Sequence, residues 1–260
     1  MKPSGIVTLT TDFGTSDYYQ AVMKGVILSS NPECKIVDIT HGISKHAVSE
    51  ASYVLSSSYK YFPKGTIHLA VVDPGVGSKR LPIMIKTDDY YYVGPDNGIF
   101  SFLKDQKNIK VYAIKQPEKV SNTFHGRDIF APAASKLSKG IKPEELGVEV
   151  KDFIKLKIKN PLYSTKRIDG EIIHADSFGN LITNLDAKKI KELIGKNSFK
   201  ANLADHTITK LLSTYDSSGN DLFLIEGSTE KIEISLKNNS AKDLTKANIG
   251  DSVEIIIGNL

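Results

Sequence analysis

The sequence is poor in the residues that several kinds of site and cross-link require. Its 260 residues include one cysteine, Cys34, and no tryptophan. A single cysteine excludes an internal disulfide and any cysteine-based metal site. The six histidines show neither H-x-x-x-H nor H-E-x-x-H spacing, so we predict no metal site. A chain without disulfides fits a reducing compartment, and we expect a cytoplasmic protein.

Long apolar runs and blocks of one charge are also missing. No stretch approaches the roughly 18 apolar residues that a membrane-spanning helix needs. The start, MKPSGIVTLTTDFG, has a short apolar run broken by threonines, which is typical of a strand and not of a signal sequence. The net charge of +4 is spread over short clusters such as Lys188-Lys189. We therefore expect neither a membrane nor a nucleic acid as a partner.

Three common signatures of catalysis or nucleotide binding are absent. Gly75-Val76-Gly77 is followed by Ser78-Lys79-Arg80, which does not complete the dinucleotide-binding pattern G-x-G-x-x-G. The sequence also lacks a Walker pattern and the G-x-S-x-G elbow of serine hydrolases. Composition and spacing alone thus predict a cytosolic α/β enzyme with an undefined small-molecule site.

The first part of the chain alternates between strand-like and helix-like patterns. The predicted strands cover residues 6–10, 35–39 and 66–72, and the predicted helices cover residues 17–30, 48–59, 97–103 and 128–137. A hairpin is expected from residues 81–86 and 90–93. In the first helix, the spacing puts Ala21, Val22, Gly25, Val26 and Ile27 on one face. This alternation predicts an α/β domain over residues 1–155, with a mostly parallel sheet flanked by helices.

The pattern changes after about residue 150. Short strands are predicted at residues 171–175, 181–183, 222–225 and 231–236 and at Ser252–Ile257. One short helix, Ala187–Ile194, lies among them. This composition predicts a smaller antiparallel β domain, barrel-like or a sandwich, over residues 166–260.

Polar, glycine-containing segments follow several of the predicted strands. They are residues 11–14 (TDFG), 73–80 (DPGVGSKR), 94–98 (GPDNG) and 123–128 (TFHGRD), with 176–180 (DSFGN) in the second domain. Ligands of open α/β sheets bind at this edge. Taken singly, Asp73 is explained by closing a turn, and a lone His125 is more often structural than catalytic. The segments indicate where a site lies and leave its chemistry open.

The five segments together resemble the S-adenosyl-L-methionine (SAM) hydroxide adenosyltransferases, a family similar to the bacterial fluorinases and chlorinases. TTDFG, VVDPGVGS-x-R, GPDNG, TFHGRD with FAPAA, and DSFGNLITN occur in the family's order over nearly the whole chain. The resemblance implies an α/β N-terminal domain and a β-barrel-like C-terminal domain. It also implies a homotrimer that holds its ligand between the N-terminal domain of one subunit and the C-terminal domain of its neighbour.

The same resemblance implies an activity and a set of site residues. Water or hydroxide attacks C5′ of the ribose of SAM, which is substrate and not cofactor, and releases adenosine and L-methionine. The family's catalytic Asp, Arg and His fall on Asp73, Arg80 and His125. Its substrate-binding positions fall on Asp12, Asp17, Tyr19, Asp176, Phe178, Asn180, Ser228 and Asn238.

Some of these assignments have plain structural alternatives. Asp12 corresponds to the carboxylate that binds the ribose diol, and Asp176 and Phe178 to groups that hold the methionine ammonium and the adenine. Outside the family, turn formation explains Asp176 and core packing explains Phe178. Lys237 stands where the family has an arginine, and lysine cannot make the same bidentate contact.

Two rival functions remain open at this point. One is halide-dependent cleavage of SAM to 5′-halo-5′-deoxyadenosine, and the other is a SAM-binding module without turnover. A carboxylate beside the nucleophile repels a halide, so Asp73 with Arg80 and His125 favours an oxygen nucleophile. Retention of all three residues argues against the non-catalytic module.

Overall fold

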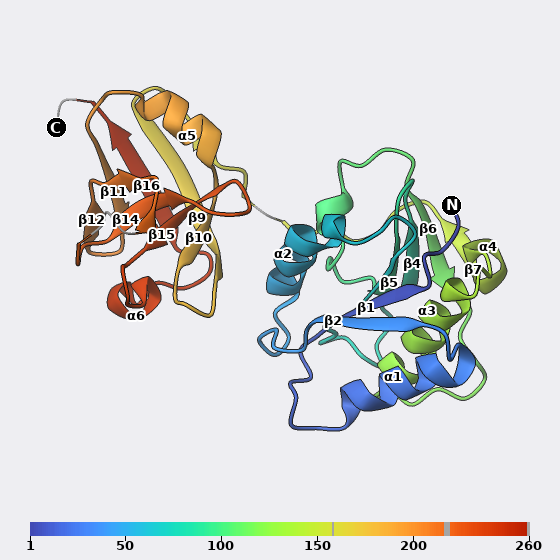
Figure 1. Cartoon of the computed structure of the whole chain (residues 1–260). Helices are drawn as coiled ribbons and strands as arrows, with labels where there is room; N and C mark the ends of the chain where they lie inside the picture. The colour runs from blue at the N-terminus through green and yellow to red at the C-terminus, as the bar shows by residue number, and fades with distance from the viewer. Residues whose placement is uncertain (158, 216–218, 259–260) are drawn as a thin grey trace. The chain divides into compact units, whose positions relative to one another are not determined.

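The computed structural model describes residues 1–157, 159–215 and 219–258. It divides into two compact units, Met1–Leu156 and Lys157–Leu260 (Figure 1). Each unit has its own sheet, and buried apolar side chains form separate clusters within each. In the described part of the chain, no helix is long and apolar enough to cross a membrane.

The first unit is built on a seven-stranded sheet. Its strands are β1 (Ile6–Thr11), β2 (Lys35–Thr40), β3 (Ile67–Val71), β4 (Pro82–Lys86), β5 (Tyr91–Pro95), β6 (Lys110–Ile114) and β7 (Gly147–Val150), in the order β2-β1-β3-β5-β4-β6-β7. Strands β2, β1, β3 and β5 pair in parallel. The predicted hairpin forms β4 and β5, and β6 and β7 continue antiparallel. The α/β class is confirmed, but the sheet is mixed because these last strands extend it from the hairpin.

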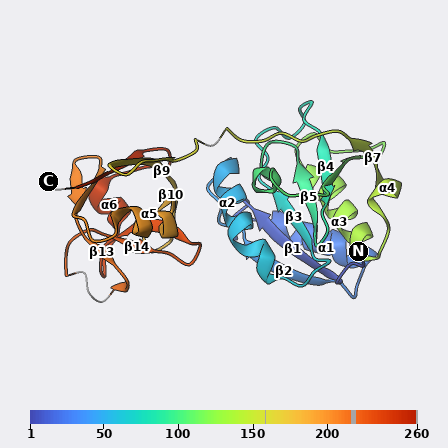
Figure 2. The same cartoon turned by 90° about the horizontal axis from the view of Figure 1, so that it is seen from above.

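Helices cover both faces of this sheet (Figures 1 and 2). They are α1 (Tyr19–Ser30), α2 (Val48–Ser58), α3 (Ala131–Ser138), which continues a π-helical turn at Gly126–Phe130, and the short α4 (Pro143–Leu146). Side chains of α1 and α3 share one core cluster with β1 and β3, and α2 packs in another. Of the predicted helix at residues 97–103, only the 3₁₀ turn Ser101–Leu103 is helical.

The predicted inward face of α1 is confirmed in part. Ile27 is fully buried, and Val22 and Val26 pack against the core cluster. Ala21 and Gly25 are exposed instead, and Met23 is buried in addition. Apolar residues surround this helix almost completely, so their spacing does not select one face. Contacts with α3 decide the orientation instead.

The second unit is a curled, mainly antiparallel sheet. Its strands are β8 (Leu162–Tyr163), β9 (Arg167–Ala175), β10 (Leu181–Asp186), β11 (Phe199–Leu203), β12 (His206–Ile208), β13 (Leu211–Leu212), β14 (Phe223–Glu226), β15 (Lys231–Ser235) and β16 (Ser252–Ile257). The order is β12-β11-β16-β9-β10-β15-β14-β13, with β8 on β9. Among the described strands of this unit, only the pair β13–β14 is parallel. The barrel-like prediction is confirmed in the form of a half-barrel.

Two helices complete this unit, α5 (Ala187–Ile194) and α6 (Ala241–Thr245). Helix α5 has the predicted bounds. The carboxylate of Asp186 caps it by accepting a hydrogen bond from the Lys189 amide at 2.9 Å. Its buried residues are Ala187, Ile190 and Ile194, a spacing that places one face on the core.

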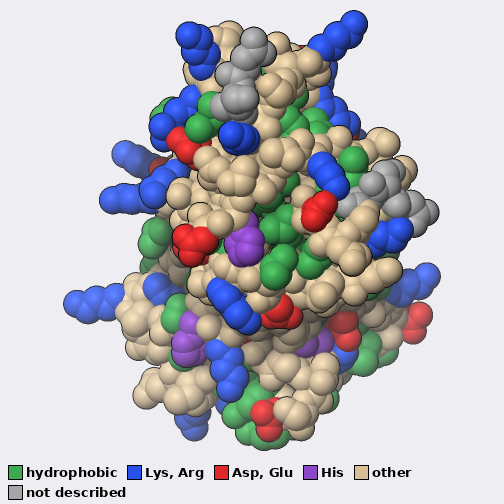
Figure 3. Space-filling view, turned by 90° about the vertical axis from the view of Figure 1, so that its left-hand side faces the viewer, with side chains coloured by type: hydrophobic (Ala, Val, Ile, Leu, Met, Phe, Trp, Pro, Cys, Tyr) green, Lys and Arg blue, Asp and Glu red, His purple; other side chains and the backbone are tan. Residues whose placement is uncertain are grey.

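Charged side chains are dispersed over the surface seen in Figure 3. Lys and Arg lie among Asp and Glu there and do not gather in one patch. This distribution is typical of a solvated surface.

The core of the first unit contains a histidine packed among aromatic rings. His68 is fully buried, and its Nδ1 lies 2.9 Å from the hydroxyl of Thr8. Aromatic rings surround it, with Tyr92 stacked at 5.3 Å and Tyr90 also at 5.3 Å between ring centroids. Burial lowers the pKa of His68 from 6.5 to about 3, because an apolar surrounding disfavours the charged imidazolium.

We expect the free energy of unfolding of this unit to fall as the pH decreases from 6.5 towards 3. Over that range the unfolded chain protonates His68 and the folded unit does not, which costs up to about 1.4 kcal/mol per pH unit. The His68→Phe variant should lose this slope, measured by urea unfolding with tyrosine fluorescence. His206→Phe, in the second unit, is the control. An equal slope in the wild type and His68→Phe would contradict the assignment.

Candidate active site

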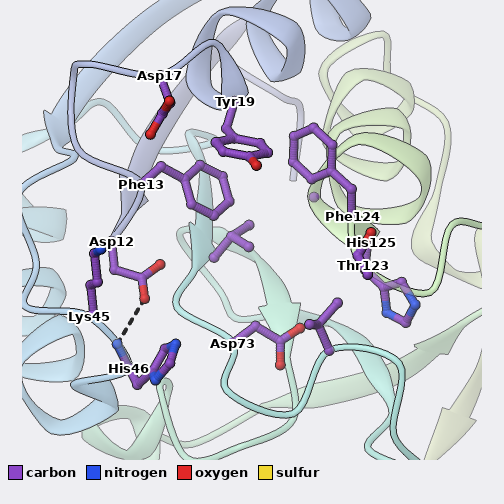
Figure 4. A pocket seen from close by; sticks show the side chains of 13 residues that line it. Asp12, Phe13, Asp17, Tyr19, Lys45, His46, Asp73, Thr123, Phe124 and His125 are labelled. Atoms are coloured by element: carbon purple, nitrogen blue, oxygen red, sulfur yellow. Dashed lines mark hydrogen bonds between the residues drawn. The ribbon is translucent and has the colours of Figure 1, made fainter.

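A cavity of about 280 Å³ opens at the carboxyl ends of β1 and β3 (Figure 4). The chain leaves β1 at Thr11 and β3 at Val71, so the segments that follow each strand meet here. The cavity is lined by Asp12, Phe13, Asp17, Tyr19, Lys45, His46, Val71, Asp73, Val76, Thr123, Phe124, His125 and Gly126.

Asp73, Arg80 and His125 form a continuous hydrogen-bonded chain. The Nε of Arg80 donates to both carboxylate oxygens of Asp73, at 2.9 and 3.0 Å, and its Nη2 also bonds Oδ2. The same Nη2 lies 2.7 Å from Nδ1 of His125. The side chains of Arg80 and Asp73 are only 7% and 5% exposed. Asp73 and His125 line the cavity, while Arg80 lies behind them and joins them.

This geometry fixes the position of the proton on His125. A guanidinium has only donors, so Nδ1 of His125 accepts the hydrogen bond from Arg80. In the neutral ring the proton is then on Nε2. Burial, followed by the positive charge of Arg80, lowers the pKa of His125. His125, which lines the cavity, therefore keeps its Nε2–H free of the contact with Arg80.

Two motifs hold the Asp73 segment in place. The side-chain amide of Asn97, in the GPDNG segment, donates to the carbonyl of Val72 at 2.8 Å. Gly77 has a φ of +76°, and a Cβ at this position would lie 2.5 Å from the carbonyl oxygen of Asn122. The loop carrying Asp73 thus packs directly on the chain that leads to His125.

We expect Gly77→Ala to lower turnover although Gly77 has no reactive group. The new Cβ must push the Asn122 backbone away and distort the Asp73–His125 spacing, and the positive φ adds about 1 kcal/mol of strain. Steady-state kinetics should show kcat reduced by about tenfold or more, since small displacements of reacting groups cost up to about 100-fold. Gly140→Ala has a matching φ of +91° and open space around it, so its kcat should be unchanged. Equal kcat in both variants would contradict the packing argument.

Aromatic rings and a carboxylate form the remaining walls of this cavity. Phe13, Tyr19 and Phe124 pack together, with centroid distances of 5.2 to 6.0 Å. Oδ2 of Asp12 accepts the backbone N–H of His46 at 2.9 Å (Figure 4). This bond orients the Asp12 carboxylate and leaves oxygen lone pairs for hydroxyl donors.

The second unit has a cavity of its own, of about 820 Å³. It lies where the β9–β10 turn, the β14–β15 turn and the segment before α6 meet. Its lining includes all five residues that the family resemblance selects in this unit: Asp176, Phe178, Asn180, Ser228 and Asn238. The remaining lining residues are Tyr215, Glu226, Gly227, Glu233, Leu236, Lys237, Asn239 and Ser240.

The structure separates the alternatives for Asp176 and Phe178. Oδ1 of Asp176 accepts the N–H groups of Phe178 and Asn180, each at 2.9 Å, and Oδ2 accepts the Asn180 side-chain amide at 2.9 Å. Asp176 therefore does form the turn. Phe178 is 78% exposed, so core packing does not explain it, and its ring is available to a planar ligand.

Models of known protein families match both units of the chain. The model of the SAM hydroxide adenosyltransferase N-terminal domain matches residues 7–147, and that of the C-terminal domain matches residues 170–254. The chain belongs to the SAM hydroxide adenosyltransferase family. The resemblance seen in the motifs is thereby confirmed.

Several relatives of this chain are named as hydrolases. The (R)-S-adenosyl-L-methionine hydrolase of Methanocaldococcus jannaschii is 35% identical, over 96% of this chain and 95% of the relative. That of Thermus thermophilus is 38% identical over 71% and 75%. An uncharacterised conserved protein of Thermotoga maritima superposes with a TM-score of 0.89 at 31% identity, over 96% and 99%. A fluorinase of Nocardia brasiliensis is more distant, at 24% over 72% and 73%.

The structure groups the predicted site residues of this family member into two sets. Asp12, Asp17, Tyr19, Asp73 and His125 line the first cavity, with Arg80 behind it. The five residues of the second unit line the other. Within residues 1–157, 159–215 and 219–258, no three His, Cys, Asp or Glu side chains are placed to hold a metal ion.

Sequence reasoning missed several lining residues. Phe13 and Phe124 lie inside the quoted motifs, so their positions carried a signal. Glu233 interrupts the apolar run of β15, where an acidic residue between isoleucines also marks a special position. Tyr215 and Lys45 have no comparable signature in the sequence.

Proposed function

We propose that this chain hydrolyses SAM to adenosine and L-methionine by attack of a water-derived oxygen on C5′ of the ribose. The observation that carries the proposal is the buried Asp73–Arg80–His125 chain at the edge of a cavity that also holds Asp12. The names of the relatives support the same reaction and specify the (R) epimer at sulfur. We therefore propose (R)-SAM as the preferred substrate.

The reaction places few demands on the protein. As the bond between oxygen and C5′ forms, the C5′–S bond breaks and its electron pair returns to sulfur, giving the neutral thioether of methionine. No general acid is required. Water has a pKa of about 15.7, and without a metal the site must stabilise the developing hydroxide by other means. One proton is released to solvent for each adenosine formed.

The His125 tautomer indicates how that stabilisation is achieved. Its Nε2–H donates to the nucleophilic oxygen, while Nδ1 is occupied by Arg80. Both oxygens of Asp73 accept from Arg80. We infer that the site binds hydroxide through a preorganised donor, as oxyanion holes bind developing negative charge. Arg80 acts as a positioning residue, and alignment of the oxygen behind C5′ supplies a further part of the rate.

The substrate contacts are proposed from the two cavities. Asp12 accepts hydrogen bonds from the ribose diol, with Asp17 and Tyr19 beside it, and Phe178 stacks on the adenine near Asn180, Ser228 and Asn238. The first cavity, of about 280 Å³, is smaller than most ligand pockets. We therefore propose a homotrimer in which neighbouring subunits share each substrate. We also propose that the enzyme is cytoplasmic and uses neither a metal nor a cofactor.

The test is incubation of the purified protein with each SAM epimer, followed by chromatography with and without chloride. Adenosine and methionine are the expected products, and oxygen from labelled water should appear at the adenosine 5′ position. A halogenated nucleoside would establish the halide reaction, for which the more distant fluorinases give less support. Unchanged SAM would favour a binding module. Alanine at Asp73, Arg80 or His125 should lower turnover far more than SAM affinity.

A further inference from the structure

The second cavity contains a buried carboxylate that the reaction described above does not use. Glu233 is 8% exposed and lines this cavity. It belongs to β15, where Ile232 and Ile234 on either side of it are fully buried in the core cluster of the unit. Since successive strand residues point to opposite faces, Glu233 lies on the other face of the sheet, which faces the cavity.

The surroundings of Glu233 are arranged around its carboxyl group. The hydroxyl of Tyr215 donates to Oε2 at 3.1 Å. Gly227, in the β14–β15 turn, leaves the space in which Oε1 lies, because a Cβ there would be 1.8 Å from that oxygen. Any other residue at position 227 would displace the carboxylate. Burial raises the pKa of Glu233, and the nearby charge of Asp176 adds to this effect.

The two carboxylates differ in what they still offer to a ligand. A carboxylate has about four lone-pair positions. In Asp176, three lone-pair positions accept hydrogen bonds from described residues, all within its own turn. In Glu233, hydrogen bonds from described residues occupy one lone-pair position. Asp176 is therefore largely committed to local structure, and Glu233 retains more capacity to accept.

We propose that Glu233 is a specificity-determining residue that binds the α-ammonium group of the substrate, with Asp176 adding negative potential beside it. This inference rests on the proposed function. Of the three carboxylates that line the cavity, Glu226 is paired with Lys191. Asp176 and Glu233 remain to attract a cation, and an ammonium group brings three donors. A buried acid next to a second acid is costly until a cation compensates both charges, so the substrate itself supplies the missing partner.

The test compares SAM with an analogue that lacks the α-amino group, using the intact protein. In the Glu233→Gln variant, KM for SAM should rise by about 10- to 100-fold, the value of a charge-assisted hydrogen bond. KM for the deaminated analogue should change by less than about threefold. The kcat for SAM should stay within about threefold, because the ammonium lies far from C5′. The Glu230→Gln variant, with an exposed carboxylate in the same turn, is the control.

A second variant covers the case in which Glu233→Gln does not fold, as judged by circular dichroism. Tyr215→Phe removes the hydroxyl that orients Glu233 and should raise KM for SAM alone, by about two- to tenfold. An equal rise for both substrates, or none, would overturn the ammonium assignment while wild-type turnover still supports the hydrolase. A wild-type protein that neither binds nor cleaves SAM would reject both proposals.

Discussion

Replacing His125 with glutamine should preserve most of the turnover, whereas alanine should lower kcat by about 100- to 1000-fold. The amide of glutamine supplies an N–H donor near the position of Nε2, but it cannot accept a proton. The contact with Arg80 makes His125 an N–H donor through Nε2. If donation is its only role, the amide N–H of glutamine is sufficient for turnover. Adenosine release, measured by chromatography over a range of SAM concentrations, separates kcat from KM.

The pH dependence provides a second measurement on the same variants. Because the pKa of His125 is lowered from 6.5, nearly all of the His125 side chains are neutral above pH 6.5. A hydroxide-binding site should still show kcat rising above pH 7, by up to tenfold per pH unit, in both the wild type and His125→Gln. A plateau above pH 7, together with a glutamine variant as slow as the alanine variant, would instead identify His125 as a general base.

Arg80→Lys should lower kcat by about 100-fold or more with little change in KM. Lysine keeps the charge but has no planar fork, so it cannot bond both oxygens of Asp73 and Nδ1 of His125 together. His125 then loses the contact that fixes its tautomer and orientation. We also expect the free energy of unfolding to fall by about 1–3 kcal/mol, since a buried acceptor loses part of its hydrogen bonding.

Arg127→Lys is the matched control for this substitution. Arg127 follows His125 closely in the chain, but its side chain is 43% exposed and pairs with Asp128. An exposed pair of this kind contributes at most about 1 kcal/mol, so kinetics and urea unfolding should both be close to wild type. Similar losses in the two lysine variants would show that Arg80 has no special function.

The elements that the sequence predicted well are those with a strong local signal. Helix α5 has clear amphipathic spacing and a capping Asp186, and β3 is a continuous buried run. Strand β7, at Gly147–Val150, is short and exposes Val148, so its identity depends on pairing with β6. The side of α1 that is buried likewise depends on α3, which the local pattern does not contain.

The segments that form the site were predictable from the sequence, but the relative positions of their side chains were not. Strand ends and the family motifs located Asp73, Arg80 and His125, but a spacing of residues in a loop does not say which side chain lies between the others. That Arg80 is the middle member follows only from the folded loops, which Gly77 holds against Asn122. The same limit applies to Glu233, whose cavity is assembled by three separated turns.

The pairing of Asp73 with Arg80 has a consequence for ion selection. One negative and one positive charge cancel, so the hydrogen-bonded chain behaves towards distant ions as a dipole and carries no net charge of its own. Its influence on anions is short-ranged and depends on contact with the imidazole N–H, so dissolved chloride is not concentrated at the nucleophile position by long-range attraction. The full charges of the reacting centre are the sulfonium and the developing hydroxide, which lie close together, so turnover should depend only weakly on ionic strength.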